Sequence, residues 1–172
     1  MRRVLRRLTP WIVLVVLAAA VGWSRVGGDG SGGSGGEVSA RVVRVVDGDT
    51  IVVSIDGRED RVRYIGIDTP ESVKPGTPVQ CYAKRASKEN ARLVAGRTVR
   101  LVSDAEARDR YGRRLAYVYR SDDGLLVNLE LARTGYARPL TIAPNVAHAG
   151  QIAAAVASAR RAGRGLWSAC SR

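Results

Sequence analysis

The chain has 172 residues, of which 28 are lysine or arginine and 16 are aspartate or glutamate, so its formal charge at pH 7 is +12. This length fits one domain of ordinary size, and the excess of positive charge favours polyanionic partners such as nucleic acids. Because there are only two cysteines and one histidine, a zinc site built from these residue types is excluded.

The N-terminal part predicts export from the cytoplasm. Residues 1–26 begin with four arginines and continue as a mostly apolar run from residue 8, which is typical of a signal peptide or of a signal-anchor helix in the membrane. Small residues at 18–20 favour cleavage, whereas the length of the run favours an anchor. Either way, we expect an extracytoplasmic protein, membrane-anchored or secreted. Residues 27–36 comprise seven glycines, two serines and one aspartate and predict a flexible linker before a folded domain at 37–172.

The two cysteines, Cys81 and Cys170, both fall in the part predicted to be exported. An even number of cysteines in an oxidising compartment favours a disulfide. The alternative is two separate small residues in the core.

Five segments rich in valine or other strand-forming residues predict β-strands at 38–46, 50–55, 61–67, 98–103 and 115–119. Three segments with helical periodicity predict helices at 81–95, 125–133 and 148–162. Five short strands, interrupted by a helix between the third and the fourth, favour an α+β fold built on an oligonucleotide-binding (OB) type β-barrel with three helices. His148 falls where the last helix begins, so we interpret it as a helix-start residue and not as a catalytic one.

Oxygen ligands for a metal ion occur in two turns of this predicted barrel. Asp49 and Asp68 carry carboxylates, which suit a hard cation such as calcium or magnesium. Thr69 precedes Pro70, which restricts its backbone to an extended conformation and aims its carbonyl reproducibly. We therefore predict a metal site at Asp49, Asp68 and Thr69, with Asp47 bracing its own turn.

Three further residues complete the requirements of phosphodiester hydrolysis. Glu71 lies two residues beyond Thr69, near enough to hold a water beside the metal and to act as a general base. Arg63 and Arg113 carry planar guanidinium groups that bind phosphate oxygens in pairs. Taken singly, each motif also fits an ordinary turn or surface loop, and their joint occurrence in this order favours a catalytic site.

Together these motifs resemble the staphylococcal nuclease (thermonuclease) family. The resemblance covers about residues 42–168 and rests on 47–50, Arg63 with 67–71, 109–113, 115–117, 127–128, 131–137 and 166–168. It implies a five-stranded barrel with three helices and a calcium-dependent endonuclease that cuts DNA and RNA to 3′-phosphate and 5′-hydroxyl ends. It also implies calcium at Asp49, Asp68 and the Thr69 carbonyl, and catalytic roles for Arg63, Glu71 and Arg113.

Contacts with the nucleic acid are expected at Arg110 and Tyr111, whose ring is available to a base or sugar. The family's prototype has tyrosines where this chain has Leu140, Thr141 and Ile142, a departure that bears on base preference. We expect single-stranded substrates to be favoured and the protein to be a monomer.

A second interpretation is a catalytically silent OB-type module that binds nucleic acid and is tethered to the membrane. A third is a tethered protein-interaction module, which leaves the arginine pair unexplained. A pure nucleic-acid binder has no need for Glu71 or for a group of acids facing a polyanion, so the sequence favours the nuclease.

Overall fold

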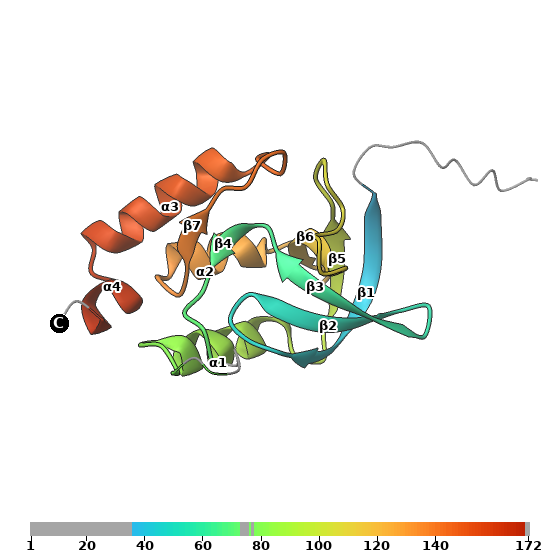
Figure 1. The fold of residues 1–172 in the computed structure, drawn as a ribbon, viewed down its shortest axis with the longest axis horizontal. Helices are drawn as coiled ribbons and strands as arrows, with labels where there is room; N and C mark the ends of the chain where they lie inside the picture. The colour runs from blue at the N-terminus through green and yellow to red at the C-terminus, as the bar shows by residue number, and fades with distance from the viewer. Residues whose placement is uncertain (1–35, 73–75, 77, 171–172) are drawn as a thin grey trace, which may run out of the picture. The chain divides into compact units, whose positions relative to one another are not determined.

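The computed structural model describes residues 36–72, 76 and 78–170. Five strands close into the predicted barrel in the order β1-β2-β3-β6-β5 (Figure 1). Their bounds are β1 Glu37–Val45, β2 Thr50–Ile55, β3 Arg58–Tyr64, β5 Thr98–Val102 and β6 Arg114–Arg120. The OB-type α+β fold is thus confirmed.

The barrel is antiparallel except at one seam. β1 pairs with β2 on one side and with β5 on the other, while β3 and β6 run parallel, with Arg63 opposite Leu115. Parallel strands need a long crossover connection, which here contains the first helix and β5. The seam therefore brings the end of β3 beside the loop that leads into β6.

The third predicted strand, 61–67, is two strands in the structure, because the chain bends between Tyr64 and Gly66. Gly66 has a φ of +84°, a backbone conformation that favours glycine, and a Cβ there would lie 2.5 Å from Ile152 Cδ1 and displace the end of that side chain. After the bend, β4 (Gly66–Asp68) leaves the barrel and pairs with β7 (Arg138–Leu140). β7 was not predicted, because three residues give no readable alternation.

The three predicted helices are confirmed as α1 Ala83–Val94, α2 Val127–Arg133 and α3 Ala149–Arg161. A fourth, α4 (Leu166–Ala169), is too short to show helical periodicity. α1 contacts β1 and α2, whereas α3 contacts α2 and the small β4–β7 sheet (Figure 1).

Aliphatic side chains fill the barrel, and with phenylalanine absent the largest fully buried residues are Tyr64 and Tyr117. The amide of Asn128 on α2 is also fully buried. It accepts a hydrogen bond from Val118 N–H (2.9 Å) and donates to the carbonyl of Ile65 (2.8 Å). Asn128 thus ties the bend after β3 to β6 and α2.

A disulfide joins Cys81, just before α1, to Cys170, just after α4, with a Cα–Cα distance of 5.9 Å. Between Cys81 and the helix lies Tyr82, whose φ of +70° is rare for a bulky residue. Its ring packs against that of Tyr136 at 5.3 Å between centroids. The start of α1 is thus held covalently and by side-chain packing.

The predicted signal segment at 1–26 and nearly all of the predicted linker at 27–36 lie outside the described residues. Among the helices that are described, none has the length and apolar character needed to cross a membrane.

Candidate active site

A small polar cavity lies where the β1–β2 turn, the end of β3, the end of β4 and the loop before β6 meet. Its volume is about 60 Å³. It is lined by four carboxylates and two guanidinium groups, together with Thr50, Thr69 and Pro70; the charged residues are Asp47, Asp49, Asp68, Glu71, Arg63 and Arg113. All residues predicted to bind the metal or to act in catalysis therefore line one cavity.

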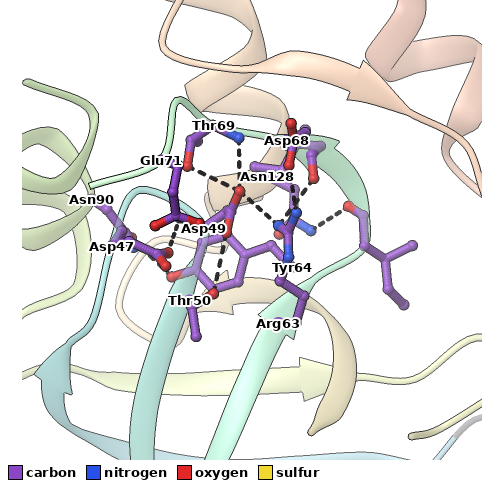
Figure 2. A network of polar contacts seen from close by, with 12 residues as sticks. Asp47, Asp49, Thr50, Arg63, Tyr64, Asp68, Thr69, Glu71, Asn90 and Asn128 are labelled. Atoms are coloured by element: carbon purple, nitrogen blue, oxygen red, sulfur yellow. Dashed lines mark hydrogen bonds and ion pairs between the residues drawn. The ribbon is translucent and has the colours of Figure 1, made fainter. Parts of the chain in front are cut away.

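Asp49 is at the centre of this cavity and is only 4% exposed (Figure 2). Its Oδ2 accepts hydrogen bonds from the N–H and the hydroxyl of Thr69, at 2.7 and 2.9 Å. The same oxygen lies 2.7 Å from Nη1 of Arg63. Two turns that are 20 residues apart in the sequence are therefore joined through one carboxylate.

Burial raises the pKa of the Asp49 carboxyl to about 7, because desolvation disfavours the charged form and the neighbouring Asp47 adds to the effect. Arg63 and the hydrogen bonds from Thr69 oppose this shift only in part. Burial thus outweighs the nearby positive charge at this carboxyl.

Arg63 bridges the two predicted metal-binding carboxylates. Besides its contact with Asp49, its Nη2 donates to Oδ1 of Asp68 at 2.9 Å, and Nη1 donates to the carbonyl of Ile67 at 3.1 Å. Figure 2 shows Arg63 and Asp68 on one side of Asp49, with Asp47 and Glu71 on the other. The bend at Gly66 permits this contact, because it turns Asp68 back towards the end of β3.

The Asp47–Asp49 turn is braced as the sequence predicts. Oδ1 of Asp47 accepts a hydrogen bond from the Asp49 N–H at 3.1 Å, and the Asp47 carbonyl accepts one from Nδ2 of Asn90 at 2.9 Å. A Cβ on Gly48 would lie 2.6 Å from Oγ1 of Thr69. The turn thus packs directly against Thr69.

Glu71 lines the same cavity, and its main chain is held from across its loop. Its N–H donates to Oε1 of Gln80 at 2.9 Å, and its carbonyl accepts from the Gln80 N–H at 3.0 Å. Cys81 of the disulfide follows directly. The position of Glu71 therefore depends on Gln80 and on the start of α1.

Arg113 reaches the cavity from the loop before β6, across the parallel seam. Both oxygens of Asp109 hold it: Oδ1 accepts from the Arg113 N–H at 3.0 Å and Oδ2 from its Nε at 2.7 Å. Burial by itself would raise the pKa of Asp109, but hydrogen bonds from Arg113 and from the Tyr111 N–H outweigh it and lower the pKa. Asp109 is therefore a charged partner that orients Arg113.

Arg110 and Tyr111, predicted to contact nucleic acid, line a wider hollow of about 480 Å³ beside the cavity. Arg63 and Arg113 line both spaces, and the far wall of the hollow includes Leu140. Tyr111 is 68% exposed, and its hydroxyl accepts a hydrogen bond from Nη2 of Arg110 at 2.7 Å. The hollow is large enough for a nucleotide and has a polar and an aliphatic side.

The side chains of the cavity fit a divalent cation in chemistry and in charge. Four carboxylates line the cavity with two guanidinium groups, and one of these, that of Arg113, is already paired with Asp109, so acidic groups outnumber the free cationic ones. In the described part of the chain, no three acidic, histidine or cysteine side chains are grouped as a metal site. A cation here would rest on Asp49 and Asp68 with main-chain or water oxygens, the coordination that hard cations accept.

Two supporting residues were missed from the sequence. Asn90 is fully buried on α1 and accepts a hydrogen bond from the Tyr64 hydroxyl at 2.9 Å. An asparagine among the apolar residues of this helix is the sequence feature that could have identified Asn90 as a buried supporting residue. No sequence feature identifies Gln80 in this way, because its hydrogen bonds to Glu71 connect two ends of a loop. His148 lies at the start of α3, as predicted, and its Nε2 contacts the Tyr119 hydroxyl at 3.2 Å.

Comparison with known proteins identifies the family of this chain. Residues 61–169 match the family model described as staphylococcal nuclease homologue. The chain is 43% identical over 132 residues to a thermonuclease of Staphylococcus hyicus, with 77% of each chain covered. It is 42% identical over 147 residues to a thermonuclease of Staphylococcus intermedius, covering 82% of this chain and 86% of that one. Endonuclease YncB of Bacillus subtilis is 46% identical over 102 residues, covering 59% of this chain and 47% of its own. The chain therefore belongs to the staphylococcal nuclease family.

Proposed function

We propose that this protein is a calcium-dependent endonuclease that works outside the cytoplasm and cleaves DNA and RNA to 3′-phosphate and 5′-hydroxyl ends. Its family and its thermonuclease relatives make it a nuclease, that is, a phosphodiester hydrolase. One observation supports metal-dependent cleavage at this site. Four carboxylates and two arginines surround a small polar cavity at the edge of a hollow large enough for a nucleotide.

Asp49, Asp68 and the Thr69 carbonyl are the proposed calcium ligands. When bound, calcium would supply positive charge that stabilises the phosphoryl oxygens as negative charge builds up on them. Asp49 is already fixed for this role, since Thr69 holds one of its oxygens twice.

Glu71 is the proposed general base. Its carboxylate accepts a proton from a water molecule while the water oxygen forms a bond to phosphorus and the bond from phosphorus to the 5′ oxygen breaks. The 5′ oxygen takes up a proton and leaves as a hydroxyl, and the phosphate stays on the 3′ oxygen. Arg63 and Arg113 bind the phosphate oxygens from two sides of the cavity.

The extracytoplasmic location rests on the predicted signal segment at 1–26 and on the Cys81–Cys170 bond, since disulfides persist in oxidising compartments. The silent nucleic-acid-binding module remains the competing interpretation. Such a module would bind nucleic acid through its basic surface, and neutralising Glu71 would not impair this activity. The Glu71→Gln variant therefore distinguishes the binding module from the nuclease.

The test is digestion of single-stranded DNA by the full chain, with calcium or with a chelator. We expect cleavage only with calcium, and fragments that accept a 5′ label from a kinase without prior phosphatase treatment. Glu71→Gln should lower kcat by about 10² to 10⁴. Its matched control is Glu59→Gln on the exposed start of β3, which should leave kcat unchanged. No cleavage by the unmodified chain with calcium would refute the proposal.

A further inference from the structure

The arginines of this protein fall into two groups, those whose guanidinium group is paired with a carboxylate of the protein and those whose guanidinium group is not. Many form ion pairs with nearby carboxylates: Arg92, Arg97, Arg100, Arg108, Arg114, Arg120 and Arg133. Arg44 on β1 and Arg61 on β3 are exposed, and within the described residues they have no ion pair, hydrogen bond or ring contact. Their charge is therefore not neutralised by the protein.

These two arginines lie in one row on the outside of the barrel. Val52 of β2 is opposite Arg44 on one side and opposite Arg61 on the other, and directly opposed residues point to the same face of a sheet. The neighbours of Val52 on its strand, Ile51 and Val53, point into the core. The row Arg44–Val52–Arg61 consequently lies on the outer face of the barrel, where both arginines are exposed and Val52 between them is only 3% exposed.

The row continues into the candidate active site. Arg61 and Arg63 are two residues apart on β3, so they share its outward face at a spacing of about 7 Å. Arg61 also lines a separate hollow of about 370 Å³ together with Tyr111, Gly112 and Arg113. Arg61 and Arg113 thus line one hollow beside the candidate active site.

We propose that Arg61 and Arg44 form a second phosphate-binding site, which holds the part of a single-stranded polynucleotide that extends beyond the cleaved bond. This inference rests on the proposed function, since it continues the path of the same substrate. Guanidinium groups that lack protein partners bind phosphates without first breaking an ion pair. The exposed ring of Tyr111, between the two hollows, suits stacking of a base on this path.

The site ends after two arginines. In the next outward row, Arg41 and Glu59 flank Ser54 on β2, so a carboxylate offsets the positive charge there. We therefore expect Arg61 and Arg44 to neutralise two phosphates and to leave substrates that end at the active site unaffected.

The test compares Arg61→Gln/Arg44→Gln with a control of equal charge, Lys88→Gln/Arg161→Gln, whose residues are exposed on α1 and α3. Binding of a fluorescent 20-nucleotide single strand is measured by anisotropy with a chelator present, so that no cleavage occurs, across a range of salt concentrations. The Arg61/Arg44 variant should bind about tenfold more weakly near 0.1 M salt, and its plot of log affinity against log salt should flatten by about 1.4.

Cleavage with calcium gives the second measurement. KM for the 20-nucleotide strand should rise in the Arg61/Arg44 variant, whereas KM for a trinucleotide should change less than twofold. Equal effects of the two double variants on binding, or equal rises of KM for both substrates, would overturn the second site while leaving the nuclease proposal intact. Weakened binding by a chain that never cleaves would support the second site and refute the nuclease proposal.

Discussion

Glu71 and Gln80 hold each other by two hydrogen bonds across the base of one loop, from Glu71 N–H to Gln80 Oε1 (2.9 Å) and from Gln80 N–H to the Glu71 carbonyl (3.0 Å). Gln80→Met keeps the length of the side chain but removes the acceptor. We expect kcat to fall about tenfold with KM unchanged, because Glu71 is the proposed general base and small displacements of such a group are costly.

Steady-state kinetics with calcium checks this expectation, and a thermal unfolding curve shows whether the fold has changed. Gln151→Met, on the exposed side of α3, is the matched control. A rise in KM at constant kcat would show that Gln80 affects substrate binding and does not position Glu71.

The Cys81–Cys170 bond closes a loop of 89 residues, and the chain-entropy model assigns such a loop at most about 4.7 kcal/mol. We expect Cys81→Ser/Cys170→Ser to lower the free energy of unfolding by about 2–4 kcal/mol. Urea titration of both proteins, with and without reductant, gives the value. Reductant should destabilise only the unmodified protein, and equal midpoints for the two proteins without reductant would contradict the prediction.

Gly48 leaves no room for a side chain, since a Cβ would lie 2.6 Å from Thr69 Oγ1 and 2.8 Å from Ala86 Cβ. Gly48→Ala should destabilise the protein by about 1–3 kcal/mol and lower the rate of cleavage, because Thr69 must move away from Asp49. Calorimetry and the cleavage assay measure the two effects. Gly150→Ala, where a Cβ meets nothing within 4 Å, should show neither.

Asp60 joins two strands through Arg108 and Arg114, at 2.7 and 3.0 Å. Burial would raise the pKa of Asp60, but hydrogen bonds from both arginines outweigh it and lower the pKa. A lowered pKa in the folded state contributes stability that is present above the unfolded value of about 3.9 and is lost as pH falls through the folded value. Asp60→Asn should therefore be less stable than the unmodified protein at pH 7, with a smaller difference at pH 2–3.

Urea unfolding at several pH values tests this dependence. Asp56→Asn is the matched control, since it removes a carboxylate from the exposed β2–β3 turn. Asparagine tolerates the φ of +50° at this position, so the backbone of the turn is kept. A constant difference between Asp60→Asn and the unmodified protein over the whole range would exclude the proposed linkage.

The barrel could be predicted from the sequence because its strands carry valine-rich segments bounded by glycine turns, as at Thr50–Ile55. The contact between Arg63 and Asp68 could not, because it depends on a bend at Gly66 that a continuous apolar pattern conceals. Motif order and family resemblance identified candidate residues for the site. They did not show that Arg63 itself bridges Asp49 and Asp68.

Supporting contacts were the least predictable. Gln80 lies in a segment without periodicity, and its partner is nine residues away. Arg44 and Arg61 share one face of the sheet because both lie opposite Val52 in the strand register. A shift of one residue in the register would place them on opposite faces. Such relationships follow from the closed barrel and not from any single segment.

The two cysteines of the disulfide are synthesised at different times. Cys170 follows Cys81 by 89 residues, so at translation rates of about 5–20 residues per second it is made roughly 4 to 18 seconds later. During this interval the loop that carries Glu71 has no covalent anchor and depends on Gln80 and the packing of α1. The disulfide on this side of the cavity therefore cannot form until α4 and Cys170 have been synthesised.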